Sequence, residues 1–175
     1  MATMTFRNDL ITIQEVQVIS HSLFDSVQHV PGVEWIYSYE PLPRLYTDHS
    51  IMRGGNIMGL DRTQDDLICK LVICPAGKLF SLIRTIVTML APRWSSAAND
   101  AVMAAAATSW VEQIRELTAV LGTSDPFIYL NYAEKFQDPF ESYGAMNDEK
   151  MKAVAAKYDP GNVFGTLVPG GFKLR

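Results

Sequence analysis

The chain has 175 residues, of which 48% are hydrophobic and 19% are charged, and its formal net charge is −4. This length and composition predict one ordered domain with a buried core, residues 1–175, and exclude a disordered chain. The acidic balance and the lack of a Lys/Arg cluster predict that nucleic acid is not a partner. Two cysteines are too few for a disulfide framework or a structural zinc site, so no metal is expected.

The N-terminal residues carry no basic start followed by an apolar run, so we expect no secretory signal. The longest apolar run, residues 75–93, is too short and too interrupted to predict a membrane span. These features predict a cytoplasmic protein.

The first strand and helix of the chain are predicted from apolar spacing. Residues 3–13 alternate loosely and predict a strand. Residues 15–30 repeat apolar side chains at helical spacing, and Pro31 with Gly32 ends that helix in a turn.

A strictly alternating segment follows at residues 33–40, VEWIYSYE, and it predicts a strand. Alternation places Trp35, Tyr37 and Tyr39 on one face of that strand. Three stiff rings in a row either fill a core or form the wall of a site for a flat organic ligand. From the residues alone, the core is the favoured interpretation.

The middle of the chain predicts one strand and two helices. Residues 67–74, LICKLVIC, are mostly apolar and predict a buried strand. Residues 75–93 carry apolar pairs at helical spacing and predict an amphipathic helix. Residues 101–121 are rich in alanine and predict the best helix of the chain, which Gly122 ends.

The C-terminal block, residues 127–172, combines a predicted aromatic strand at 127–132, a polar loop, a helix at 146–157 and a turn at 159–162. Its polar side chains are either a pocket edge that polarises a carbonyl or a corner in which they satisfy one another. They are Tyr129, Asn131, Tyr132, Glu134, Gln137, Asp138, Tyr143 and Asn147. The order of strands and helices predicts an α+β fold with helices on one face of a sheet.

Six stretches of the sequence resemble the fungal branch of the berberine-bridge-enzyme-like FAD-linked oxidoreductases. They are VPGVEW (30–35), EPLP (40–43), RGGNIMGLD (53–61), IYLNYAEKFQDP (128–139), SYGAMNDEKMKAV (142–154) and KYDPGNVFGTLVPGGFKL (157–174). The resemblance implies that the chain is a single truncated substrate domain, built on an antiparallel sheet. It also implies that residues 127–175 are the family's C-terminal segment, which folds back on the flavin.

The resemblance also implies site residues. Tyr132 matches the last tyrosine of the family's Tyr-X-Asn-Tyr motif, which acts on the substrate as a base or as the partner of the base. Tyr132 and Asn131 are therefore the predicted catalytic residues. The predicted substrate-binding residues are Trp35, Tyr37, Tyr39, Tyr129, Tyr143 and Asn147.

Two departures from the family pattern shape the functional expectation. The FAD-binding domain that precedes this region in the family has no counterpart in the sequence, so no cofactor is expected, and FAD only if a partner chain supplies that domain. Residues 75–92 look inserted, either as a helix that covers exposed surface or as an artefact of the gene model.

Three hypotheses follow. In the first, a flavin-free protein of fungal secondary metabolism binds a hydrophobic natural-product intermediate and catalyses its cyclisation, cycloaddition or isomerisation by holding a reactive conformer. In the second, the chain is half of an FAD-dependent oxidoreductase that needs a flavin-binding partner. In the third, it is a non-catalytic binding or dimerisation module. A homodimer is expected under any of them.

Overall fold

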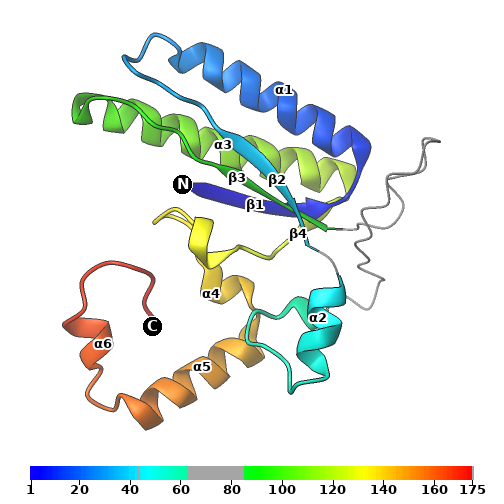
Figure 1. Ribbon diagram of the computed structural model, residues 1–175, viewed down its shortest axis with the longest axis vertical. Helices are drawn as coiled ribbons and strands as arrows, with labels where there is room; N and C mark the ends of the chain where they lie inside the picture. The colour runs from blue at the N-terminus through cyan, green and yellow to red at the C-terminus, as the bar shows by residue number, and fades with distance from the viewer. Residues whose placement is uncertain (43, 63–84, 175) are drawn as a thin grey trace.

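The computed structural model describes residues 1–42, 44–62 and 85–174, and Figure 1 shows their arrangement. The predicted strand at 67–74 and the first part of the predicted helix at 75–93 lie outside the described residues. The strands are β1 (Ala2–Arg7), β2 (Tyr37–Pro41), β3 (Thr85–Leu90) and β4 (Ser124–Asp125). The α-helices are α1 (Leu10–Val27), α2 (Arg44–Ile51), α3 (Asp100–Leu121), α4 (Pro139–Ser142), α5 (Ala145–Tyr158) and α6 (Val163–Thr166).

The four strands form one sheet in the order β2-β3-β1-β4, and every neighbouring pair is antiparallel. The register places Ala2 opposite Leu90 in the β1–β3 pair, and Tyr37 opposite Leu90 in the β2–β3 pair. The predicted α+β fold with an antiparallel sheet is confirmed.

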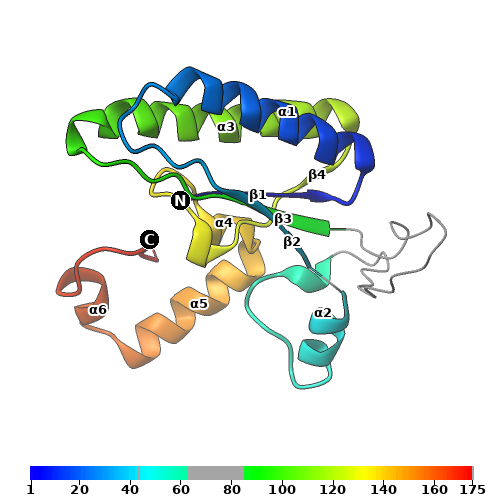
Figure 2. The ribbon, with the colours of Figure 1, turned by 45° about the horizontal axis from the view of Figure 1, so that its top comes forward.

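Helices α1 and α3 lie side by side on one face of the sheet (Figure 2). The core between them contains Phe6, Val16, Leu90, Trp110 and Ile114, all fully buried. Alternation along β1 and β3 turns every second side chain toward these helices, so the sheet supplies one wall of this core and the apolar helix faces supply the other.

The opposite face of the sheet is covered by residues 127–143, and Met151 of α5 packs against them. Val87 of β3 packs there with Phe127 and Tyr143, both buried. The chain thus has three layers at its centre, and residues 127–143 form the third.

Several predicted elements differ in the structure. The first strand ends at Arg7 because Asp9 caps α1: its carboxylate accepts a hydrogen bond from the backbone N–H of Thr12 at 2.8 Å. The helix predicted at 75–93 is wrong for Thr85–Leu90, which is β3. Its β-branched residues suit a strand, and pairing with β1 and β2 on both sides overrides helical spacing.

The predicted strand at 127–132 is also wrong. Leu130–Tyr132 form a short 3-10 helix, and Phe127 is held by Asp125, whose carboxylate accepts from the Phe127 backbone N–H at 3.0 Å. The backbone of this segment does not pair with any of the described strands, and its aromatic side chains pack against the face of the sheet.

The strand predicted at 33–40 is shorter, since β2 begins at Tyr37 and only Glu34 before it forms an isolated bridge, to Arg93. The helix predicted at 15–30 is α1, which begins at Leu10 and ends at Val27. Two other helices are confirmed closely: α3 ends before Gly122, and α5 spans the predicted helix at 146–157.

In the part of the chain that the structure describes, no helix combines the length and the apolar character needed to cross a membrane.

Candidate functional site

The aromatic residues of the β2 segment lie on the face of the sheet that α1 and α3 cover. Trp35, Tyr37 and Tyr39 are partly buried against the core described above. The Tyr39 hydroxyl donates to the carbonyl of Ile13 at 3.1 Å, and the Tyr37 hydroxyl is 3.1 Å from Nε2 of His21. This arrangement matches the interpretation of these rings as core, and their role in binding a substrate stays a prediction.

Burial also changes the chemistry of Tyr39. Desolvation, with a smaller contribution from neighbouring Tyr37, raises the pKa of Tyr39 to about 12. A phenol with so high a pKa does not act as a base near neutrality.

The other predicted tyrosines gather on the opposite face of the sheet. Tyr129 and Tyr132 meet edge to face with ring centroids 4.9 Å apart, and Tyr143 stacks on Phe127 at 5.9 Å. Leu42, Met58, Leu60 and Met151 pack around these rings. We call Tyr129, Tyr132, Tyr143 and Phe127 the tyrosine cluster.

Glu40 joins this cluster from β2. The Tyr132 hydroxyl donates to the Glu40 carboxylate, with distances of 3.1 Å to Oε1 and 3.4 Å to Oε2. The hydrogen bond to Glu40, followed by the charge of Glu40, raises the pKa of Tyr132. Sequence reasoning missed Glu40, because 92 residues separate the two side chains and only the fold brings them together.

The two predicted asparagines bond to their own neighbourhood. Asn131 Nδ2 donates to the Tyr129 hydroxyl at 2.7 Å, and Asn147 Nδ2 donates to the carbonyl of Tyr143 at 3.1 Å. Asn131 is therefore close to Tyr129 and Tyr132, whereas Asn147 orients the turn that begins α5. These contacts agree with the interpretation of a corner whose polar groups satisfy one another.

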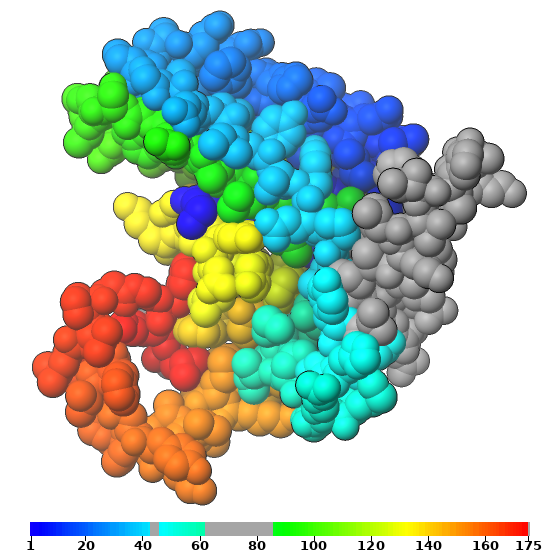
Figure 3. Space-filling model, in the orientation of Figure 1, coloured from blue at the N-terminus to red at the C-terminus, as the bar shows by residue number. Residues whose placement is uncertain are grey.

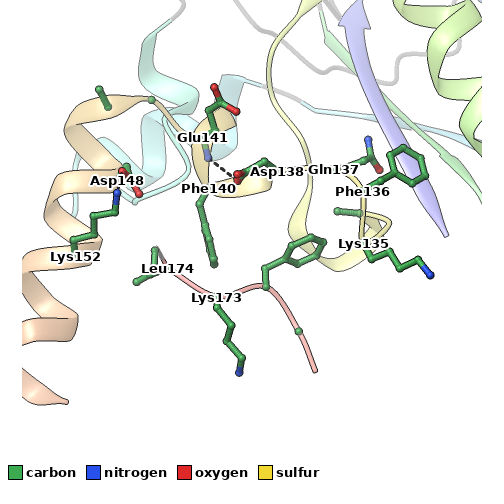
Figure 4. Close-up of a pocket in the computed structure, with 15 residues that line it drawn as sticks. Lys135, Phe136, Gln137, Asp138, Phe140, Glu141, Asp148, Lys152, Lys173 and Leu174 are labelled. Atoms are coloured by element: carbon green, nitrogen blue, oxygen red, sulfur yellow. Dashed lines mark hydrogen bonds and ion pairs between the residues drawn. The ribbon is translucent and has the colours of Figure 1, made fainter. Parts of the chain in front are cut away.

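A cleft of about 840 Å³ lies beside this corner, between residues 133–141, the start of α5 and the C-terminal residues 171–174 (Figure 4). Its apolar lining comes from Phe136, Phe140, Phe172 and Leu174, and its charged lining from Lys135, Asp138, Glu141, Asp148, Lys152 and Lys173. None of the predicted catalytic or substrate-binding residues lines this cleft, but Gln137 and Asp138, two of the polar side chains considered for a pocket edge, do. The other lining residues were missed because the return of the C-terminal residues to the 133–141 segment is a tertiary contact without a sequence signal.

The lining residues do not fit an FAD site by themselves. Lys152 is held by Asp148 at 2.6 Å, and Lys173 donates to the carbonyl of Phe164 at 3.0 Å, so two of the three cations are engaged. Asp138 and Glu141 add negative charge where a pyrophosphate would need positive charge or free backbone N–H groups. The described residues also hold no group of three potential metal ligands.

Comparison with known proteins gives relatives most of which are FAD-dependent monooxygenases. The chain is 31% identical over 175 residues to the FAD-dependent monooxygenase drtC of Aspergillus calidoustus, covering 98% of the chain and 30% of that protein. It is 41% identical over 160 residues to the bifunctional solanapyrone synthase of Alternaria solani, covering 91% of the chain and 27% of that protein. It is 34% identical over 135 residues to the FAD-dependent monooxygenase sdcF of Emericella nidulans, covering 77% of the chain and 24% of that protein.

No family model matches the sequence, and no solved structure matches it. The chain spans less than a third of the length of the relatives named above. It is therefore similar, over nearly all of its own length, to one region of fungal FAD-dependent monooxygenases.

Proposed function

We propose that this chain is the substrate-binding region of a fungal FAD-dependent oxidoreductase and that another polypeptide region, which docks on its C-terminal arm, holds the flavin. The C-terminal arm is defined as residues 145–168, comprising α5 and α6. The similarity to FAD-dependent monooxygenases supports the class of enzyme, and the poor fit of the chain's own cleft to FAD supports a flavin site elsewhere.

The observation that carries the proposal is the exposed apolar surface of the arm. No residue of α5 or α6 is buried. The exposed large apolar side chains of the arm are Met146, Val154, Tyr158, Val163, Phe164, Leu167 and Val168. Phe164 is 69% exposed and Leu167 is 75% exposed.

So many large apolar side chains exposed on one segment mark an interaction site, because exposing them to water is unfavourable. In Figure 3 the arm, coloured orange to red, curves away from the rest of the molecule and leaves a hollow beside it. A docking polypeptide that covers the arm would remove this surface from water and close the hollow.

The substrate side of the proposal rests on the tyrosine cluster. The proposed ligand is a hydrophobic intermediate of fungal secondary metabolism, because the cluster consists of aromatic rings and apolar side chains pack around it. Tyr132, with Asn131 beside it, remains the first candidate for contact with its reacting group.

The test uses the full chain with and without a flavin-binding polypeptide. The chain is purified alone, mixed with FAD and scanned for visible absorbance. It is then coexpressed with the FAD-dependent monooxygenase drtC from which the matching region has been deleted. We expect a colourless chain that ignores FAD, and a yellow one-to-one complex after coexpression.

The role of the C-terminal arm in docking is tested by placing charged side chains on its apolar surface. The double variant Phe164→Asp/Leu167→Asp should abolish the complex, since two carboxylates would be buried without partners. Val120→Asp is the matched control, because Val120 is 85% exposed on α3, away from the arm, and should leave the complex intact. Stoichiometric flavin in the chain alone, or a complex that survives the double variant, would refute the proposal.

Flavin-free cyclisation is the alternative. An enclosed apolar cavity that ends at Tyr132 would favour it, whereas the cleft formed by the described residues does not include Tyr132. Flavin-free cyclisation and a non-catalytic dimerisation module are therefore less well supported than the substrate-binding region of an FAD-dependent oxidoreductase. Sedimentation of the purified chain separates that module from the main proposal, because a homodimer that covers the arm would block the complex.

A further inference from the structure

The cleft beside residues 133–141 has no ligand assigned in the proposed function. Its volume of about 840 Å³ suits an organic molecule of moderate size. The 133–141 segment, the first turns of α5 and residues 171–174 form its walls. Phe136, Phe140 and Phe172 contribute three rings to the lining, so the body of a ligand would rest on aromatic surface.

Several polar side chains of the cleft are already engaged with other groups of the chain. Gln137 is buried, and its amide bonds to both backbone groups of Thr3 and accepts from the Glu134 N–H at 3.1 Å. Lys152 and Asp148 form an ion pair, so their charges cancel. These side chains therefore leave little polar capacity for a ligand.

The other two lysines of the lining extend away from the rings. Figure 4 shows that Lys135 and Lys173 point away from Asp138 and Phe140. Lys173 Nζ donates to the carbonyl of Phe164 at 3.0 Å, outside the cleft. Neither ammonium group is therefore directed at the aromatic lining.

Two carboxylates remain available, and both lie at α4. Asp138 caps this helix, because its Oδ1 accepts from the backbone N–H of Glu141 at 3.0 Å. Its second oxygen has no hydrogen-bond partner within the described part of the chain, and neither has the carboxylate of Glu141. The polar capacity left in the cleft is that of acceptors with negative charge.

We propose that this cleft binds a protonated amine carried on an aromatic body. The ammonium group donates to the free oxygen of Asp138, and the body lies on Phe140 and Phe172. Aromatic rings favour the same charge, because the face of a ring attracts a cation. The start of α5 also lines the cleft and favours an anion, so an anionic ligand is the rival that the experiment includes.

This site is separate from the tyrosine cluster, none of whose residues lines the cleft. The inference goes beyond the proposed function and does not rest on it, because the amine needs only residues of this chain.

The experiment uses three probes that share an indole ring and a two-carbon linker. Tryptamine carries an ammonium group at neutral pH, tryptophol a hydroxyl group and indole-3-propionate a carboxylate. Each is titrated into the isotope-labelled full chain, and backbone amide chemical shifts report the affinity and the location. We expect tryptamine to bind about fivefold more tightly than tryptophol, the gain of an exposed ion pair, and indole-3-propionate to bind most weakly. The shifts should centre on Gly144, Ala145 and Gly171, which line the cleft.

Variants separate the charge from the rings. Asp138→Asn keeps an oxygen that can cap α4 but loses the charge, so tryptamine should bind only as tightly as tryptophol. Glu149→Gln removes a charge at an exposed position of α5 outside the cleft and should leave all three affinities unchanged. Phe172→Ala should weaken all three probes, whereas Phe164→Ala, on α6 and outside the cleft, should weaken none.

The amide spectrum of each variant also shows whether it folds. If Asp138→Asn does not fold, Glu141→Gln takes its place and should reduce the preference for tryptamine. The inference is overturned if tryptamine binds no more tightly than tryptophol, if indole-3-propionate binds most tightly, or if the shifts centre elsewhere. It is also overturned if the folded charge variant keeps the full preference for the amine.

No flavin and no second polypeptide enter these titrations. A failure of the coexpression experiment therefore leaves this result standing, and the reverse also holds.

Discussion

The side-chain amide of Gln137 pairs with both backbone groups of Thr3. The Thr3 N–H donates to Gln137 Oε1 at 3.1 Å, and Gln137 Nε2 donates to the Thr3 carbonyl at 2.6 Å. β4 is only two residues long and pairs with Thr5 and Phe6, so it does not reach Thr3. The amide thus takes the place of a strand at the edge of β1 and ties the C-terminal block to the sheet.

Gln137→Ala should lower the free energy of unfolding by about 2–4 kcal/mol, because it leaves two buried backbone groups of Thr3 without partners. Urea denaturation measures this change. Gln137→Glu should also destabilise, since a carboxylate cannot donate to the Thr3 carbonyl. Lys135→Ala, at an exposed position two residues away, is the control and should change stability little. Equal effects of Gln137→Ala and Lys135→Ala would contradict this role.

Ser20→Ala should destabilise the chain by about 1–3 kcal/mol, because the buried indole N–H of Trp110 donates to the Ser20 hydroxyl at 2.8 Å and would lose its acceptor. The double variant Ser20→Ala/Trp110→Phe should cost less than the sum of the two single variants, since neither partner is then left unsatisfied. Ser22→Ala, exposed on the same helix, is the control. Strict additivity in thermal or urea unfolding would argue against the hydrogen bond.

Tyr39 should make the chain less stable at alkaline pH. Its pKa is about 12 in the folded chain and about 10 in an unfolded one, so the folded state holds the proton more tightly. The stabilisation that protonated Tyr39 gives to the folded state is complete below about pH 10 and is lost as the pH rises to about 12. Because Tyr39 is only partly buried, we expect this loss to lower the free energy of unfolding by about 1 kcal/mol.

The measurement is urea unfolding of Tyr39→Phe and the unmodified chain across that pH range. The variant should show a shallower loss of stability, and Tyr46→Phe, on the surface of α2, should show the unmodified slope. Parallel curves for Tyr39→Phe and the unmodified chain would exclude Tyr39 as the source.

Gly122→Ala should cost about 1 kcal/mol of stability, because Gly122 ends α3 in the left-handed region at φ 68°. A Cβ atom there would meet nothing within 4 Å, so the cost is one of backbone conformation alone. Gly122→Asn should cost less, and Gly161→Ala, at a glycine outside the left-handed region, should be near neutral. A Gly161→Ala cost equal to that of Gly122→Ala would contradict the argument.

Part of the candidate site was predictable from residue types. The polar groups of the C-terminal block were identified as a set, and their mutual hydrogen bonding, such as Asn131 to Tyr129, was one of two stated interpretations. Glu40 was not identified, because nothing in a strand sequence indicates which loop its outward side chain meets. The cleft residues Phe140 and Phe172 were missed for the same reason.

The sequence by itself determined the elements whose signals are local. Apolar spacing predicted α1, α3 and α5, and Gly122 predicted the end of α3, because helix periodicity and capping depend on neighbouring residues. The resemblance of the motifs likewise pointed to the FAD-dependent relatives.

Tertiary structure decided what depends on partners distant in the chain. Thr85–Leu90 carries helical spacing but becomes β3, because hydrogen bonds to β1 and β2 satisfy its backbone on both edges. Only the assembled sheet places Glu40 against Tyr132 and Gln137 against Thr3. The free energy of such contacts comes from burial and from hydrogen bonds across the fold, which no local pattern encodes.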